Sequence, residues 1–335
     1  MLPTITKNDV INFLKDQKSY TLHKLTRNKF VRRRIVAPKP GIIASADLAD
    51  MSSLSRYNNG YKYILVFIDV FSRLAQAVPL KTKDANTVYE GLKKILNSTY
   101  FNNLKRLNTD EGKEFYNQKV NKLLTAKGIT LYSVSSREIK ASIAERFIRT
   151  MKGKLYRYMT HQNTKKYVDV IPDVIHSYNN TQHRGLGGKH TPNEIHQLKD
   201  EHEIRKQFTK MYKKPTSSQK PVIPTLDIGQ YVRLSEIKPT FKKGYTIQNT
   251  VEIFKIIRVD TSQTPTAYYI EDLEGEPIKG IFYREELIPV SIPQFYDIEI
   301  IKTKKIAGRK KFLVKWMGYP DKFNSWIDET QLKPV

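Results

Sequence analysis

The stretch ASADLADMSSLSRYNNGYKYILVFIDVFSR, residues 44–73, decides the fold of the first half of the chain. Two apolar runs, 42–51 and 61–70, flank an Asn-Gly pair at positions 59–60, which is typical of a turn between antiparallel strands. A third run over 73–80 follows directly. The stretch therefore predicts three consecutive antiparallel strands.

Beyond these strands the pattern alternates between helix and strand. Helical patterns cover 84–96, 114–127, 141–161 and 165–179, and strand patterns cover 104–108 and 129–134. An antiparallel start followed by this alternation is typical of an α/β domain with a mixed sheet. We expect this domain to occupy residues 41–200.

The amino-acid composition excludes several classes of protein and favours one kind of partner. The 335 residues include 58 Lys and Arg against 33 Asp and Glu, a formal net charge of +25, which favours a polyanionic partner such as nucleic acid. The absence of cysteine excludes disulfides, thiol catalysis and zinc sites that contain Cys. The longest apolar run, 63–71, is far shorter than the ~20 residues of a membrane span, and no secretory signal pattern is visible, so we expect an intracellular protein without a membrane partner.

Four further segments surround the α/β domain. Residues 1–40 are a basic N-terminal segment, with a helix expected over 8–18 and an arm, RNKFVRRR, whose Arg32, Arg33 and Arg34 are candidate DNA contacts. Residues 201–225 are polar and predict a linker. Residues 226–292 are rich in short β-like runs and predict a small DNA-binding β-barrel, with Arg233, Lys242 and Lys243 as charge-based candidates. Residues 293–335 hold two strand patterns and both tryptophans.

Three acids stand out because the protein is so basic. Asp47 lies inside the first strand, Asp110 directly follows the fourth strand, and Glu145 lies on the long helix beside an apolar stripe. Taken singly, such acids are usually caps or surface residues. If they converge, they predict a site for two Mg²⁺ or Mn²⁺ ions of the kind that supports phosphoryl transfer. Arg149 and Lys152 share the helix face of Glu145, so we expect them to contact the phosphate backbone.

The motifs in the first 200 residues resemble the retroviral-type integrases, most closely those of Maverick/Polinton DNA transposons and virophages. The stretches that carry the resemblance are YTLHK (20–24), ADLADM (46–51), YILVFIDVFSR (63–73), TDEGKEFYN (109–117), KASIAERFIRTMK (140–152) and SYNNTQHRGLGGKHTPNEI (177–195). The resemblance implies an RNase H-like core with Asp47, Asp110 and Glu145 as catalytic metal ligands. The 34 residues between Asp110 and Glu145 are one fewer than is usual in the family.

The same resemblance implies an activity and its partners. The activity is a DNA integrase, a polynucleotidyl transferase that trims element ends as a nuclease and joins their 3′-hydroxyls to target DNA, with two Mg²⁺ or Mn²⁺ ions per active site. Double-stranded DNA and a homo-oligomer, a tetramer on DNA, follow as partners, and the host nucleus as location. A virophage origin would add the virion. The family's zinc domain is not expected, because only His23 and no cysteine precedes the core.

The last segment resembles a chromodomain over residues 295–332, FYDIEIIKTKKIAGRKKFLVKWMGYPDKFNSWIDETQL. The resemblance implies a methyl-lysine cage built from Tyr296, Trp316 and Tyr319, with a methylated histone tail as partner. Trp326 corresponds to a core position of the family. Phe323 departs from the family, which often has an acid there.

Two other interpretations of the chain remain open at this level. A non-catalytic chromatin-binding protein, domesticated from an integrase, would use the same basic surface and chromodomain. A tyrosine recombinase is suggested by the tetrapeptide His202-Glu203-Ile204-Arg205, although this HxxR match falls in the expected linker.

Overall fold

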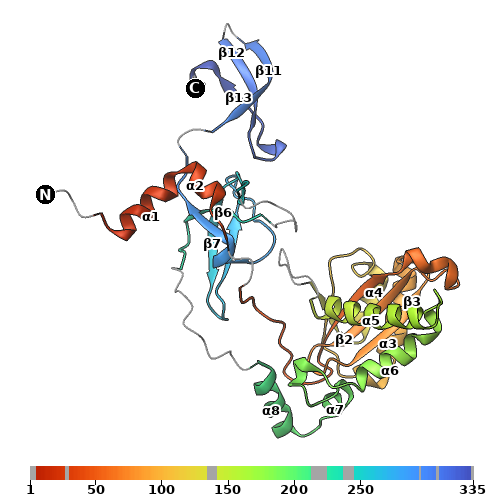
Figure 1. The fold of residues 1–335 in the computed structure, drawn as a ribbon. Coiled ribbons are helices and arrows are strands. Elements are labelled where there is room, and N and C mark those ends of the chain that lie inside the picture. Colours follow the sequence, from red (N-terminus) through yellow and green to blue (C-terminus); the bar gives the residue numbers. More distant parts are fainter. Residues whose placement is uncertain are drawn as a thin grey trace. The chain divides into compact units, whose positions relative to one another are not determined.

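The computed structural model describes residues 5–26, 30–133, 142–212, 225–236, 245–293, 296–306 and 309–332. It divides into two compact units (Figure 1). One unit is Arg34–Lys220, and the other combines Met1–Arg33 with Pro221–Val335. Within the described ranges, no helix is both long and apolar enough to cross a membrane.

The first unit is built on a mixed five-stranded sheet. Its strands are β1 (Ile43–Asp50), β2 (Tyr63–Asp69), β3 (Ala75–Leu80), β4 (Arg106–Asn108) and β5 (Thr130–Tyr132), in the order β3-β2-β1-β4-β5. The first three pair antiparallel, whereas β4 and β5 run parallel to β1. The predicted mixed α/β fold is therefore confirmed.

Helices cover both faces of this sheet (Figure 1). Alternation along β2 explains why both faces are apolar: Leu65 and Phe67 pack towards α3 (Ala85–Leu96) and α4 (Gln118–Ala126). Their neighbours Ile64, Val66 and Ile68 pack on the opposite side, towards α5 (Ser142–His161) and α6 (Ile171–Asn179). The apolar stripe of α5 lies in this second cluster, with Ala144, Phe147, Met151 and Leu155 all buried.

The expected linker begins with a helix instead. After α7 (Pro192–His196), α8 spans Glu201–Tyr212 and continues the first unit. Its Ile204, Phe208 and Met211 recur at helical spacing and pack in the cluster that contains Val70 and Phe71. The linker prediction is therefore wrong for this stretch, and residues 213–224 lie outside the described ones.

The second unit contains a five-stranded antiparallel sheet, which we call the five-stranded domain. Its strands are β6 (Tyr231–Leu234), β7 (Phe254–Asp260), β8 (Ala267–Glu271), β9 (Phe282–Tyr283) and β10 (Leu287–Val290), in the order β10-β6-β7-β8-β9. Its core includes Val232, Ile256, Tyr268 and Leu287. The sheet occupies the region predicted to form a small β-barrel.

The N-terminal segment joins this domain rather than standing apart. It forms two helices, α1 (Lys7–Asp16) and α2 (Lys18–His23), where one was expected. The backbone N–H groups of Gln248 and Asn249 both donate to the Leu22 carbonyl, at 2.9 and 3.1 Å. Because residues so far apart in the sequence form these bonds, the segment is a structural part of the five-stranded domain.

The last three strands form a separate antiparallel sheet, β11-β12-β13. They span Ile298–Ile306, Arg309–Trp316 and Ser325–Asp328, so a third strand follows the two that were expected. The short 3₁₀ helix η6, Asp321–Phe323, connects β12 to β13.

Candidate active site and DNA-contacting residues

The sheet directs Asp47 towards α5. Along β1, Ala46 packs on the side of α3 and α4, and Ala49 packs on the side of α5. Because side chains alternate along a strand, Asp47 shares the side of Ala49. Glu145 lies in the first turn of α5, on that same side of the sheet.

Asp110 reaches the same place from β4. This strand pairs parallel with β1, with Ser45 opposite Asn108, and Asp110 follows two residues later. The negative charges of Asp110, Glu145 and Glu114 all act on Asp47 and disfavour its ionisation. The structure thus brings the three predicted acids into one electrostatic cluster.

Burial is the largest influence on the pKa of Asp47. It raises the pKa of this carboxyl to about 6, and the neighbouring carboxylates raise it in the same direction. The Leu48 backbone N–H donates to Asp47 Oδ1 at 2.7 Å, which opposes the rise. A half-buried carboxyl facing three others is a site that a cation would stabilise.

Glu114 is a fourth member of this cluster, one that the sequence motifs did not single out. Its carboxylate folds back over the loop, because a Cβ placed on Gly112 would lie 2.6 Å from Glu114 Oε2. Glu114 also contributes to the raised pKa of Asp47. The available signal was its position four residues after Asp110, in the run TDEGKE.

The donor set fits a hard divalent cation. All four side chains offer carboxylate oxygens, which Mg²⁺ and Mn²⁺ prefer, and neither thiol nor imidazole is among them. Of the described residues, one trio of potential ligands has its atoms within 4.8 Å of one another, namely Asp200, His202 and Glu203, on and just before α8. Asp47, Asp110 and Glu145 do not form such a trio among the described residues, so their oxygens are not all within 4.8 Å of one another.

Two cations follow Glu145 on its face of α5. Arg149 is exposed, as a contact with DNA phosphate would need. Lys152 is half-buried, and its Nζ donates to the Asp50 carbonyl oxygen at 2.8 Å. Asp50 itself accepts hydrogen bonds from Ser52 at the exposed end of β1.

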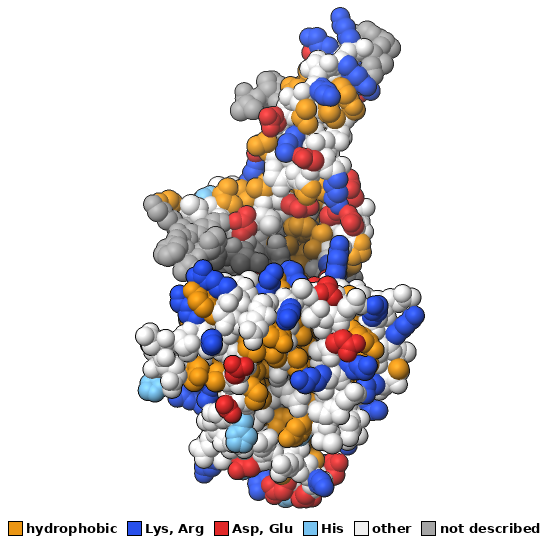
Figure 2. Space-filling view, turned by 90° about the vertical axis from the view of Figure 1, so that its right-hand side faces the viewer, with side chains coloured by type: hydrophobic (Ala, Val, Ile, Leu, Met, Phe, Trp, Pro, Cys, Tyr) orange, Lys and Arg blue, Asp and Glu red, His pale blue; other side chains and the backbone are white. Residues whose placement is uncertain are grey.

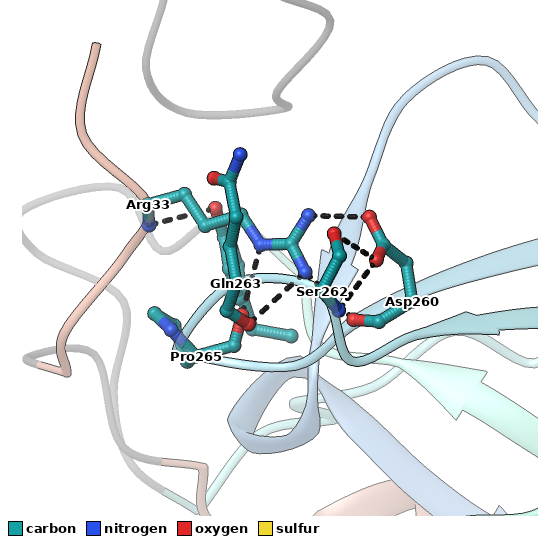
Figure 3. Close-up of polar contacts among 6 residues, drawn as sticks. Arg33, Asp260, Ser262, Gln263 and Pro265 are labelled. Carbon is teal, nitrogen blue, oxygen red and sulfur yellow. Dashed lines mark hydrogen bonds and ion pairs between the residues drawn. The ribbon is translucent and has the colours of Figure 1, made fainter. Parts of the chain in front are cut away.

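The basic arm does not present all three arginines to solvent. The Arg33 guanidinium donates to the Asp260 carboxylate at 2.6 Å and to the carbonyls of Asp260, Gln263 and Pro265 (Figure 3). Arg32 forms an ion pair with Glu286 at 3.3 Å. Arg34 is exposed. The prediction of DNA contacts is therefore corrected for Arg33, whose donors are used within the chain.

This network also holds the pKa of Asp260 well below its usual range, chiefly through the hydrogen bond from Arg33. Because a guanidinium presents a fixed fork of donors, lysine is not an adequate replacement. The network fastens the arm to the turn between β7 and β8.

Arg33→Ala is expected to release the arm from this turn. Backbone amides of residues 30–36 should then exchange with deuterium at least about tenfold faster, because local opening becomes easier. Arg33→Lys should show most of this effect. Arg34→Ala is the matched control: it should leave exchange unchanged but reduce the salt dependence of DNA binding by about one counterion. A loss of DNA affinity in Arg33→Ala without faster exchange would contradict this assignment.

The aromatic residues of the last segment do gather. Tyr296 lies 5.9 Å from Trp316 and 5.9 Å from Tyr319, measured between ring centroids. Phe323 adds a ring 5.6 Å from Tyr319. We call these four residues the ring cluster. They bring together the three predicted cage positions.

Two other predictions need correction, those for Trp326 and Arg233. Trp326 is 40% exposed, with Lys304 Nζ 4.1 Å from its ring centroid, so it is not a core residue. Arg233 is 3% exposed and donates to Thr21 and to the carbonyls of Thr250 and Val251, so it is not a surface DNA contact. Lys242 and Lys243 lie outside the described residues. In the HxxR tetrapeptide, the His202 side chain is 83% exposed and Arg205 is exposed, whereas Ile204 between them is buried against the first unit.

Comparison with known proteins connects this arrangement to a family. The integrase core domain profile matches residues 37–137, and the chromodomain profile matches residues 298–335. A transposon-derived protein of Caenorhabditis elegans is 33% identical over 218 residues, which cover 65% of this chain and 69% of that protein. The Gag-Pol polyprotein of woolly monkey sarcoma virus is 34% identical over 161 residues, 47% of this chain but 9% of the polyprotein.

A solved structure supports the fold. A chain of the simian T-cell lymphotropic virus intasome, determined in complex with PP2A regulatory subunit B56 gamma, superposes with a TM-score of 0.59. The match covers 87% of this chain and 93% of that one, at 16% identity. The chain therefore belongs to the family of retroviral and transposon-derived proteins with an integrase core domain, and it carries a chromodomain as well.

Proposed function

We propose that this chain is a DNA integrase that processes element ends and joins their 3′-hydroxyls to target DNA. The observation that carries the proposal is the convergence of Asp47, Asp110 and Glu145 on one side of the sheet, in a unit whose residues 37–137 match the integrase core domain. The net charge of +25 suits a DNA partner. Figure 2 shows Lys and Arg side chains spread over the face in view rather than gathered in one patch.

In this proposal Asp47, Asp110 and Glu145 hold two Mg²⁺ or Mn²⁺ ions. Bound ions would activate a water or a 3′-hydroxyl for in-line attack on phosphorus and stabilise the departing oxygen. Asp47 must be ionised to bind metal, so its pKa of about 6 makes the site sensitive to pH. Arg149, one turn after Glu145, would contact the DNA backbone and hold the scissile phosphate near the carboxylates.

Joining two ends in concert requires more than one active site, so we propose a homo-oligomer, a tetramer on DNA. We place its action in the host nucleus, where target DNA lies. A position in the Maverick/Polinton and virophage group, with packaging in a virion, is part of the same proposal and rests on the motifs alone.

The proposal is tested by end processing. Purified protein is incubated with a labelled duplex of the element's terminal sequence and Mg²⁺ or Mn²⁺, and the products are resolved on a sequencing gel. We expect metal-dependent loss of nucleotides from one 3′ end, suppressed by chelator. Intact duplex in the presence of folded, DNA-bound protein would favour the alternative of a non-catalytic chromatin-binding protein.

We propose that the ring cluster binds a methylated lysine of a histone tail. A quaternary ammonium is attracted to aromatic faces, and Tyr296, Trp316 and Tyr319 occupy the positions implied by the chromodomain resemblance.

Trp316→Ala is expected to weaken binding of a trimethyl-lysine peptide at least about tenfold, because Trp gives the strongest cation–π attraction. The matched control is Trp326→Ala, which removes the chain's other Trp at an exposed position. Fluorescence anisotropy with methylated and unmethylated peptides measures the effect. Equal losses in both variants would argue against the cage.

A further inference from the structure

One ring of the cluster is covered by the five-stranded domain. Tyr319 is 8% exposed, although a cage residue needs an accessible face. Burial raises the pKa of Tyr319. Arg233 and the backbone of Ile253 oppose this rise, and the carboxylate of Glu252 adds to it. All three belong to the five-stranded domain. The charge of Arg233 also opposes the rise that burial causes in the pKa of Tyr296.

The turn that leads to Tyr319 lies directly against the same domain. Gly318 has φ +84°, and a Cβ at this position would overlap the side chain of Val251. No side chain fits there unless the two segments separate. Val251 is held from behind, since its carbonyl and that of Thr250 accept hydrogen bonds from Arg233.

Ion pairs fasten the contact on either side. Lys322, in η6, forms ion pairs with Asp272 at 2.5 Å and with Glu276, and Glu274 lies 4.0 Å away. Asp272 is almost fully buried, and backbone N–H groups of its own turn hold it in place. Lys18 of α2 forms an ion pair with Asp297, next to Tyr296.

We infer that the five-stranded domain covers the ring cluster, so that the chromodomain binds methyl-lysine only after the 317–323 turn separates from that domain. This inference rests on the proposed methyl-lysine function. It makes binding of the tail compete with the contact made by Gly318, Tyr319 and Lys322. We call molecules docked when the turn contacts the five-stranded domain and open when it does not. If only open molecules bind the tail, the apparent affinity equals the intrinsic affinity multiplied by the fraction of open molecules.

The contact has a further consequence for the five-stranded domain. Arg233 and Val251 belong to that domain, so a methylated tail that draws Tyr319 away also frees their surface. Recognition of the tail would then be coupled to a rearrangement next to β6 and α2. By linkage, whatever stabilises the docked state weakens tail binding by the same factor.

Two variants of the full chain test the inference by different routes. Lys322→Glu replaces attraction to Asp272 and Glu276 with repulsion, and Gly318→Ala places a methyl group against Val251. Lys310→Glu is the matched control, because it makes the same charge change at a residue paired with Glu329 inside the chromodomain. Hydrogen exchange over 316–323 reports undocking. Anisotropy with a short basic peptide carrying one trimethyl-lysine, and with its unmethylated form, reports binding.

We expect faster exchange and about three- to tenfold tighter binding of the methylated peptide in both variants, with the control like the wild type. Faster exchange with unchanged affinity would overturn the occlusion but leave the cage intact. Unchanged exchange in both variants would show that the contact is not formed in solution and would overturn it too. Undocking without methyl-dependent binding in any protein would refute the cage itself, and the inference with it.

Discussion

Asp110→Asn is expected to lower both end processing and strand transfer at least about a thousandfold, the scale on which loss of a metal ligand or transition-state stabiliser acts. The substitution keeps the shape of the side chain and removes its charge. Asp110 faces a site where Asp47, Glu114 and Glu145 interact electrostatically, so a neutral amide there weakens the attraction for both ions. Initial rates in Mn²⁺ with a labelled terminal duplex measure the loss.

Asp50→Asn is the matched control for this experiment. Asp50 lies on the same strand, three residues after Asp47, but its side chain is exposed and accepts hydrogen bonds from Ser52. We expect its activity within about twofold of the wild type, as for a surface substitution. Equal activity of Asp110→Asn and Asp50→Asn would remove the central carboxylate from the mechanism.

Asp47→Asn is expected to inactivate the enzyme and yet stabilise the metal-free protein above pH 6. The pKa of Asp47 rises from 3.8 to about 6 on folding. The stability that this group contributes is therefore fully present below about pH 4 and is lost as the pH rises through 6. An amide carries no such cost, so at pH 8 the variant should be more stable by about 1–2 kcal/mol, after allowance for solvent screening.

Denaturant unfolding at pH 4 and pH 8, with chelator, measures this difference. The two proteins should be alike at pH 4 and should diverge as the pH rises. Adding Mn²⁺ at pH 8 should stabilise the wild type and leave Asp47→Asn nearly unchanged, because a ligand stabilises only the state that binds it. A variant less stable than the wild type at pH 8 would mean that Asp47 is not repelled by its neighbours.

The sequence made the core predictable because local pattern and tertiary role agree there. The alternation along β2 places Val66 and Phe67 on opposite sides of the sheet, and the helical stripe of α5 buries Phe147 and Met151. Asp47, Asp110 and Glu145 could be named because each stands at a strand or helix position within a dense motif. Glu114 was missed because a nearby acid after a strand is usually a cap.

The errors share a physical cause, which is pairing between residues far apart in the chain. No local signal in RNKFVRRR shows that Arg33 meets Asp260, 227 positions later, and charge alone assigned it to DNA. Arg233 was misassigned in the same way, because its partner Thr21 lies 212 residues away. The helix α8 was predictable from the spacing of Ile204, Phe208 and Met211, but the polar composition of the segment concealed it.

The most direct test of the central claim is a strand-transfer assay that reads stereochemistry. Wild-type protein, a labelled terminal duplex and Mn²⁺ are combined with target DNA that carries a phosphorothioate of known configuration at the joined position. We predict joined products with inverted configuration at phosphorus and no protein–DNA adduct, as a single in-line attack by the 3′-hydroxyl requires. Retention of configuration with a covalent adduct, or no joining by folded protein bound to both DNAs, would contradict the account.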